Sequence, residues 1–170
     1  IDRISIGLHF VLPKEMETIR KEFDDQIHKF ELLVGRKPDH LDSHKVLPKN
    51  VPELKEIFDN YSKENNTPIR DWGHANFIDS FFGLNIDGSG ELDLNKVSVD
   101  SLIQIIENEV IDGYNEIMCH AAYVDDELIE LSSYNKPREI ELNSLLSPEF
   151  ADFLTQDEIK LVSWKDVNLG

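Results

Sequence analysis

The chain of 170 residues carries 34 acidic and 17 basic side chains, which gives a formal net charge of -17 at pH 7. This charge repels phosphate backbones and anionic lipid, so we expect neither nucleic acid nor a membrane surface as a partner. No apolar run approaches the roughly 20 residues that a membrane-spanning helix needs. The single cysteine, Cys119, rules out an internal disulfide and predicts a reducing, cytoplasmic location.

The chain opens directly on a strand-like pattern. Apolar side chains alternate with other side chains over residues 4–12, which predicts a half-buried strand. The sequence starts at Ile1 with no lead-in to this strand. We therefore expect that N-terminal βα units precede these residues in the native protein.

Helical and extended segments follow. Apolar residues recur every three or four positions over residues 16–33, which predicts one buried helix face, and Gly35 is placed to end that helix. Residues 38–46 are predicted to be extended. Asn50 and Glu53 resemble a capping pair at the start of a second helix.

The second half of the chain continues the alternation. A short strand is predicted at 68–71, a helix face at 102–110 and an apolar strand at 116–120. Ser147-Pro148-Glu149 predicts a helix start, and residues 159–164 are predicted to close the chain as a final strand. Alternating strands and helices without a linker predict a single α/β domain over residues 1–170 with a mainly parallel sheet.

Three of the six histidines lie in or at the ends of predicted strands: His9, His44 and His120. In α/β folds, working residues gather at the carboxyl edge of the sheet. Side chains alternate along a strand, so His40, Asp42 and His44 are expected on one side and Ser43 on the other. This alternation excludes Asp42-Ser43-His44 as a nucleophile triad, and imidazoles beside a carboxylate favour metal chemistry instead.

Three segments carry a resemblance to a known family: GLHFVL at 7–12, GRKPDHLDSH at 35–44 and EIMCH at 116–120. In this order they are similar to the YdjC-like carbohydrate deacetylases, which include the chitooligosaccharide deacetylases. The resemblance implies the fold of that family, which is a distorted, incomplete TIM-like barrel of mainly parallel strands with outer helices. Its members remove acetyl groups from N-acetylated sugars such as chitobiose. Arg70, Arg138 and Glu141 also fall where that family places such residues.

The resemblance implies a metal site and a set of candidate catalytic residues. It makes His9 and His44 metal ligands, and it implies a third ligand from an Asp-Asp-Phe-Gly segment upstream that this chain does not contain. It implies magnesium, whereas two imidazole ligands favour zinc or another late transition metal, so the metal stays open. Asp42, His120 and Arg70 are the candidate catalytic residues.

The expected mechanism follows from that ligand set. A divalent ion lowers the pKa of a bound water toward ~7 and polarises the acetyl carbonyl, so that the water attacks the amide. Asp42 orients the site or substitutes for the upstream base, and Arg70 holds the carboxylate network or a sugar hydroxyl. His120 protonates the departing amine or binds the N-acetylated oligosaccharide.

Several alternatives remain open at this point. Residues 85–96 resemble an EF-hand loop preceded by Phe77, Phe81 and Phe82 as an incoming helix would require, but Lys96 stands where a bidentate Glu is needed. A metal-dependent hydrolase with another substrate is a second alternative, and a sugar-binding relative without turnover is a third. Homodimerisation is also left open.

Overall fold

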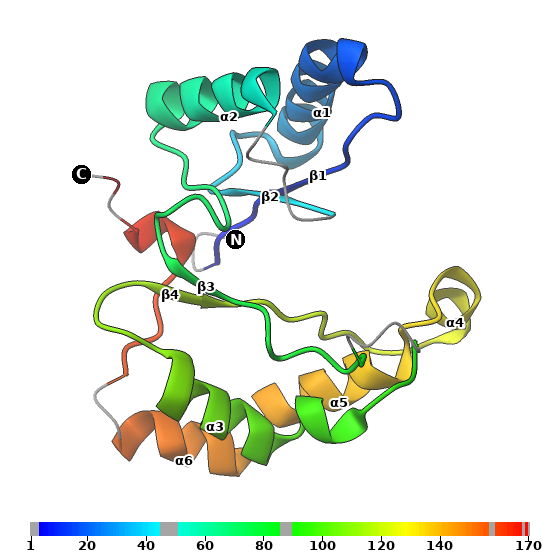
Figure 1. The fold of residues 1–170 in the computed structure, drawn as a ribbon, viewed down its shortest axis with the longest axis vertical. Coiled ribbons are helices and arrows are strands. Elements are labelled where there is room, and N and C mark those ends of the chain that lie inside the picture. Colours follow the sequence, from blue (N-terminus) through cyan, green and yellow to red (C-terminus); the bar gives the residue numbers. More distant parts are fainter. Residues whose placement is uncertain (1–3, 45–50, 86–89, 157–158, 168, 170) are drawn as a thin grey trace. The chain divides into compact units, whose positions relative to one another are not determined.

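The structure, a computed structural model, describes residues 4–44, 51–85, 90–156, 159–167 and 169 (Figure 1). Backbone contacts divide the chain into two compact units. Unit 1 comprises Ile1–Ala75 and Leu161–Gly170, and unit 2 comprises Asn76–Lys160. Units of this kind can belong to one domain, so the single deacetylase-like domain over residues 1–170 stays a prediction.

Unit 1 is built on a parallel strand pair. β1 (Leu8–Phe10) pairs with β2 (Leu41–Ser43), and the connection contains a short 3-10 turn, η1 (Met16–Thr18), and helix α1 (Ile19–Val34). Ile69 adds an isolated parallel bridge to Leu41 after helix α2 (Pro52–Asn65). A single 3-10 turn, η3 (Trp164–Asp166), lies near the end of the described chain.

The ends of the two long helices of unit 1 follow from their residues. α1 ends at Gly35, which has a φ of 80° and donates its N–H to Glu31 O, as the sequence predicted. α2 has Pro52 in its first turn, where the missing N–H removes no helical bond, and ends at Asn66 with a φ of 51°. Val51 is the N-cap of α2. The expected capping residue Asn50 lies outside the described residues.

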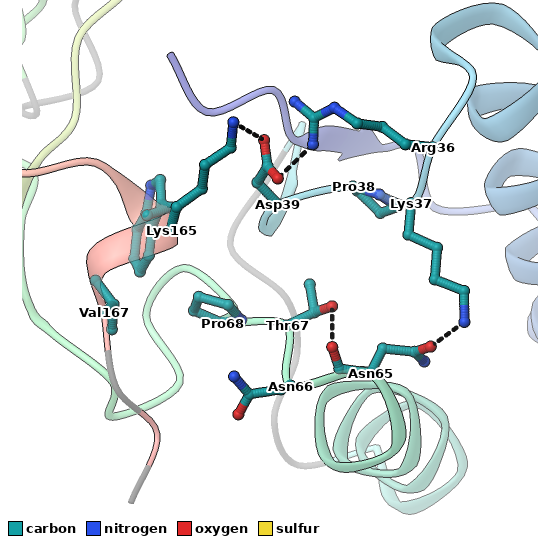
Figure 2. A pocket seen from close by; sticks show the side chains of 11 residues that line it. Arg36, Lys37, Pro38, Asp39, Asn65, Asn66, Thr67, Pro68, Lys165 and Val167 are labelled. Carbon is teal, nitrogen blue, oxygen red and sulfur yellow. Dashed lines mark hydrogen bonds and ion pairs between the residues drawn. The ribbon is translucent and has the colours of Figure 1, made fainter. Parts of the chain in front are cut away.

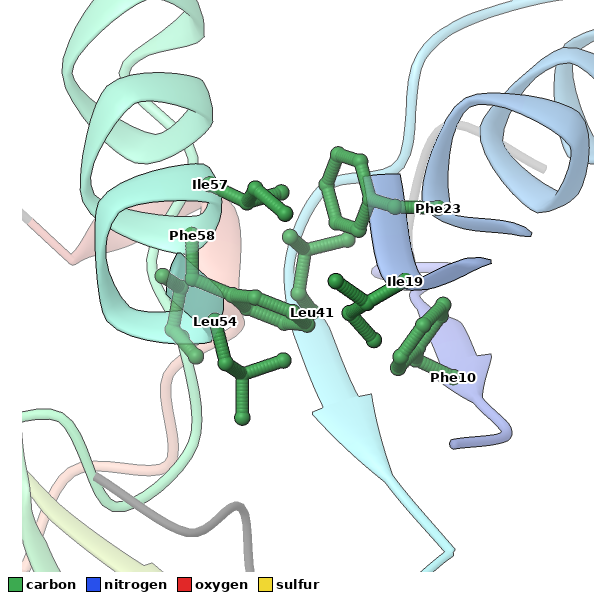
Figure 3. Close-up of a cluster of buried hydrophobic side chains, with 8 residues drawn as sticks. Phe10, Ile19, Phe23, Leu41, Leu54, Ile57 and Phe58 are labelled. Atoms are coloured by element: carbon green, nitrogen blue, oxygen red, sulfur yellow. The ribbon is translucent and has the colours of Figure 1, made fainter. Parts of the chain in front are cut away.

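The core of unit 1 lies between its helices and the strand pair (Figure 3). Three aromatic rings form its centre: Phe58 lies 5.5 Å from Phe10 and 5.0 Å from Phe23, measured between ring centroids. Aliphatic side chains of the helices and strands surround these rings and are also buried: Ile19, Leu41, Leu54, Ile57 and Ile69. This packing fixes β1 and β2 against the helices, and so positions the polar residues that alternate with the buried ones.

The Asp39 carboxylate, just before β2, contacts residues from three segments of unit 1. Asp39 Oδ2 accepts a hydrogen bond from Ile6 N at 2.8 Å and lies 3.8 Å from Lys165 Nζ, while Oδ1 accepts from Arg36. Burial alone would raise the pKa of Asp39. The hydrogen bonds from Arg36 and Ile6 and the charge of Lys165 outweigh burial and hold that pKa below its ordinary value of 3.8.

Replacing Asp39 with Asn is expected to lower the free energy of unfolding by about 1–3 kcal/mol at neutral pH, because the amide keeps the shape but loses the charge. A carboxyl group with a lowered folded-state pKa stabilises the fold above its unfolded pKa and loses that effect as pH falls through the folded pKa. Urea unfolding of both proteins from neutral to acidic pH tests this. The stability difference should narrow in acid, and a constant difference would contradict the assignment.

Unit 2 has a second parallel pair. β3 (Asn76–Ile78) pairs with β4 (Asn115–Ile117), and a 3-10 turn, η2 (Leu94–Val97), and helix α3 (Val99–Glu109) lie between them in the chain. The remaining helices follow β4 and are listed in chain order: α4 (Asp126–Leu131), α5 (Lys136–Leu145) and α6 (Pro148–Gln156). Among the described residues of this unit, the core contains seven buried hydrophobic side chains: Ile78, Phe81, Val97, Leu102, Ile105, Ile106 and Phe150.

The predicted α/β class with parallel strands is confirmed, but the extent of the sheet was not foreseen. Among the described residues, the strands form two separate two-stranded sheets, so the TIM-like barrel stays a prediction. The predicted final strand is wrong, because residues 159–163 have no regular secondary structure. The predicted strand at 68–71 is reduced to the bridge at Ile69. No helix in the described part of the chain is long and apolar enough to cross a membrane.

Candidate functional site

His9 and Asp42 lie opposite each other where β1 pairs with β2. Their sequence neighbours Phe10 and Leu41 are fully buried in the core, so alternation turns His9 and Asp42 to the other side of the sheet. His9 Nδ1 lies 2.9 Å from Asp42 Oδ1. The His9 side chain is 53% exposed, whereas that of Asp42 is only 13% exposed. The pair therefore consists of an accessible imidazole that is hydrogen-bonded to a largely buried carboxylate.

His44 lies beside His9 because its backbone extends the same ladder. The His44 N–H donates to Phe10 O at 3.0 Å. The ring centroids of His9 and His44 are 5.6 Å apart, and the ring planes are nearly perpendicular at 88°. An imidazole nitrogen binds zinc at about 2.0–2.1 Å, so two rings at this separation are close enough to share one cation.

Arg70 completes the contacts of the carboxylate. Its NH1 lies 2.9 Å from Asp42 Oδ2, and its backbone N–H donates to Leu41 O at 2.9 Å. One oxygen of Asp42 thus faces His9 and the other faces Arg70. Charge-assisted bonds of this kind are strong and directional, so Arg70 fixes the orientation of the carboxylate.

The hydrogen bond to Asp42 decides which nitrogen of His9 is available. An ionised carboxylate only accepts hydrogen bonds, so the bond to Asp42 selects the His9 tautomer with its proton on Nδ1, and in the neutral ring Nε2 then has the lone pair. Metal-ligating histidines are commonly oriented by a carboxylate in this way. The donor set formed by His9 and His44 fits two ligands of a divalent metal. Within the described ranges, no group of three or more His, Cys, Asp or Glu side chains is placed to hold such an ion.

His40 lies close enough to Asp42 for the charge of that carboxylate to act on it, in agreement with the predicted alternation, and its ring is packed within unit 1. Its ring stacks on Trp164, with centroids 5.3 Å apart and planes 21° from parallel, and burial lowers its pKa. A Cβ atom at Gly7 would lie 2.3 Å from His40 Nε2, so a larger residue at position 7 would displace the ring. His40 is therefore a packed ring held between Gly7 and Trp164.

His120 belongs to unit 2 and follows β4. Its ring packs against Phe82 and Tyr134, at centroid distances of 5.3 Å and 5.6 Å. Glu141 and Arg138, which the sequence placed among the family-like positions, both bond to the main chain of His120. The placement of His120 relative to His9 and His44 stays a prediction.

The EF-hand alternative is not supported by the described residues around it. Phe77 lies in strand β3, and no helix covers residues 79–85. Lys96 Nζ donates to Asn85 Oδ1 at 2.9 Å, so an ammonium group contacts the first expected calcium ligand. Residues 86–89 of the loop lie outside the described residues. The incoming helix that an EF-hand requires is therefore wrong, because Phe77 lies in a strand, Phe81 lies in the core of unit 2 and Phe82 packs against Tyr134.

A polar pocket lies in unit 1 at the strand ends opposite to the end that carries His44 (Figure 2). Asp39 precedes β2 and Pro68 precedes the bridge at Ile69, which places the pocket at the amino ends of the strands. Its volume is about 370 Å³. Its basic side chains already contact polar groups of the same unit, because Arg36 and Lys165 face Asp39 and Lys37 faces Asn65. The sequence patterns did not predict this pocket, since its residues come from three segments that are distant in the sequence: 36–39, 65–68 and 164–167.

A family model described as "YdjC-like protein" matches residues 3–156. The chain belongs to the YdjC-like family. A carbohydrate deacetylase of Clostridium beijerinckii is 31% identical over 164 residues, which cover 89% of this chain and 62% of that protein. A chitooligosaccharide deacetylase of Yersinia pestis is 29% identical over 161 residues, with the same coverage of 89% and 62%.

A solved structure shares the fold of this YdjC-like chain. It is described as a putative cellobiose-phosphate cleavage protein from Enterococcus faecalis V583, and it superposes with a TM-score of 0.73 at 22% identity. The match covers 91% of this chain and 62% of that protein. The chain thus spans about three-fifths of the length of the curated relatives it matches.

Tyr134 of unit 2 contacts the candidate residue His120, and the sequence patterns missed it. Its hydroxyl bonds to Glu141 at 2.6 Å and its ring packs against His120. The available signal was weak, because Tyr134 stands alone in a polar segment just before α5. Only the three-dimensional contacts connect it with His120 in this YdjC-like chain.

Proposed function

We propose that this chain forms the larger part of a metal-dependent carbohydrate deacetylase that removes acetyl groups from N-acetylated oligosaccharides of the chitobiose type. Family membership and the names of the deacetylase relatives support the reaction class. The observation that carries the proposal is the adjacent pair His9 and His44, with Asp42 fixing the ring of His9. The TIM-like barrel of the whole protein and its cytoplasmic location are part of the same proposal.

His9 and His44 would hold a divalent cation through neutral ring nitrogens. Such a cation, when bound, supplies Lewis-acid polarisation of the acetyl carbonyl and makes water a stronger nucleophile. Contacts within the chain orient His9 as a metal ligand in this proposal. Asp42 holds the proton on Nδ1, so that in the neutral ring Nε2 is the lone-pair donor, and Arg70 keeps Asp42 in place.

His120 would protonate the amine nitrogen that leaves the acetyl group. An imidazole suits this step because its ordinary pKa of about 6.5 allows it to carry and release a proton near neutral pH. The half-buried ring lies against Phe82 and Tyr134, which restricts its orientation. The remaining cation ligand would come from outside the described residues, and Asp42 is the local candidate for the base.

Acetate release from N,N'-diacetylchitobiose by the full-length protein tests this proposal. Removal of metal with a chelator should abolish acetate release, and addition of Mg²⁺, Zn²⁺ or Co²⁺ should restore it. Equal release by the metal-free protein would contradict the metal mechanism. Binding of the sugar without any acetate release would instead favour a sugar-binding relative without turnover, which is consistent with only two candidate ligands among the described residues.

A further inference from the structure

The main chain of His120 is held by two side chains of one helix. His120 lies in residues 118–125, which have no regular secondary structure, so its polar groups need partners outside a strand ladder. Arg138 NH1 donates to His120 O at 3.0 Å, and Glu141 Oε2 accepts from His120 N–H. Arg138 and Glu141 are three residues apart on α5 and share one face of it.

Both of these side chains are anchored on Tyr134. The Tyr134 hydroxyl donates to Glu141 Oε1 at 2.6 Å and accepts from Gly83 N–H at 2.8 Å. Arg138 Nε donates to Tyr134 O at 2.7 Å. Glu141 is fully buried, and burial raises its pKa against the opposing effect of these hydrogen bonds. A buried carboxylate requires such partners, so its position is tightly defined.

Tyr134 also contacts the imidazole ring itself. The rings of Tyr134 and His120 pack edge to face, with centroids 5.6 Å apart and planes at 69°. Phe82 stacks on Tyr134 at 4.8 Å and lies 5.3 Å from the His120 ring. Tyr134 therefore contacts the His120 imidazole and also holds the two side chains that bond to the His120 main chain.

We propose that Glu141 and Arg138 are positioning residues, which fix the main chain of His120 and so aim its imidazole at the leaving nitrogen. The inference rests on the proposed function, in which His120 donates the proton. A shift of about 1 Å in a proton donor can lower a rate by about a hundredfold, so fixed backbone contacts matter for this step. Glu141 and Arg138 act through His120 and need no contact with substrate.

Replacing Glu141 with Ala is expected to lower kcat by about a hundredfold with little change in KM, because the proton donor is displaced while substrate contacts remain. Glu141→Gln should keep most of the activity, since its carbonyl still accepts from His120 N–H. Ser144→Ala is the matched control. Ser144 is buried on the same helix and donates to Val97 O at 2.8 Å, so its loss perturbs α5 without touching His120.

A double-substitution cycle separates positioning from general stabilisation. Glu141→Ala should cause no further loss of kcat in a protein that already carries His120→Ala, because its effect passes through the imidazole. An undiminished loss in that background would overturn the proposal. An equal loss of kcat in Ser144→Ala would overturn it as well. Should Glu141→Ala fail to fold, Tyr134→Phe, which removes the hydroxyl that bonds to Glu141, takes its place in the same cycle.

The ¹H–¹⁵N NMR signals of the His120 imidazole provide a readout that does not depend on activity. We expect Glu141→Ala to shift and broaden these signals and Ser144→Ala to leave them unchanged. Unchanged signals in Glu141→Ala would overturn the positioning role even in an active enzyme. Absence of acetate release by the native protein, or normal release by His120→Ala, would instead refute the proposed function or the role of His120 in it.

Discussion

Replacing His9 with Ala is expected to lower acetate release by more than about a hundredfold. Loss of a residue that only orients a metal ligand typically costs 10–100-fold in affinity or activity, so loss of a ligand should cost more. His9 projects from β1 beside His44 at a centroid distance of 5.6 Å, and alanine removes one of the two nitrogens. Steady-state acetate release by the full-length variant, measured at saturating metal and sugar, gives the effect.

Substitutions of Asp42 and His28 are the controls for this result, with an intermediate loss and no loss of rate expected, respectively. Asp42→Asn keeps the size of the side chain but weakens the hold on His9 Nδ1, so we expect a loss of about 10–100-fold. His28 is exposed on α1, away from the candidate ligands in the sequence, and His28→Ala should leave the rate unchanged. Equal rates in His9→Ala and His28→Ala would show that His9 is not part of the site.

Replacing Phe58 with Ala is expected to lower the free energy of unfolding of unit 1 by about 3–5 kcal/mol, because the change leaves a cavity among well-packed aromatic rings. Phe58 is fully buried and contacts Phe10 and Phe23. Trp72 lies 6.0 Å from the Phe58 ring, so tryptophan fluorescence during urea unfolding reports on this core.

Leu33→Ala on α1 is the matched control for the core substitution. Its side chain is 76% exposed, so removing it should change the free energy of unfolding by less than about 0.5 kcal/mol. Similar destabilisation by Phe58→Ala and Leu33→Ala would contradict the core shown in Figure 3. A large loss in Phe58→Ala alone would agree with it.

Local patterns predicted much of unit 1 because each depends on short-range geometry. The repeat over residues 16–33 describes a helix face, and Gly35 ends the helix because it adopts a positive φ that other residues resist. The predicted strand at 159–164 failed for a complementary reason. Alternation gives two faces, but a strand also needs a neighbour for its backbone, and Leu161 is instead 74% exposed in a segment without regular structure.

The candidate site was partly predictable for the same reasons. Alternation in two parallel strands brings His9 and Asp42 together, and the family-like motif pointed to His44. The pattern also grouped His40 with Asp42, whose charge acts on the His40 ring, but it did not predict that this ring stacks on Trp164. Trp164 is distant in sequence, and no local pattern predicts such a partner. The contacts of Tyr134 with Glu141 and His120 depend on tertiary packing in the same way.

Cation binding by the metal-free full-length protein tests the central claim most directly. Titration with Co²⁺, followed by equilibrium dialysis and visible absorption, should show one high-affinity ion per chain in the native protein and in His28→Ala. The double variant with alanine at His9 and His44 should lose that ion or bind it more than about a hundredfold more weakly. Undiminished binding of one ion by the double variant would contradict the assignment of these two imidazoles as ligands.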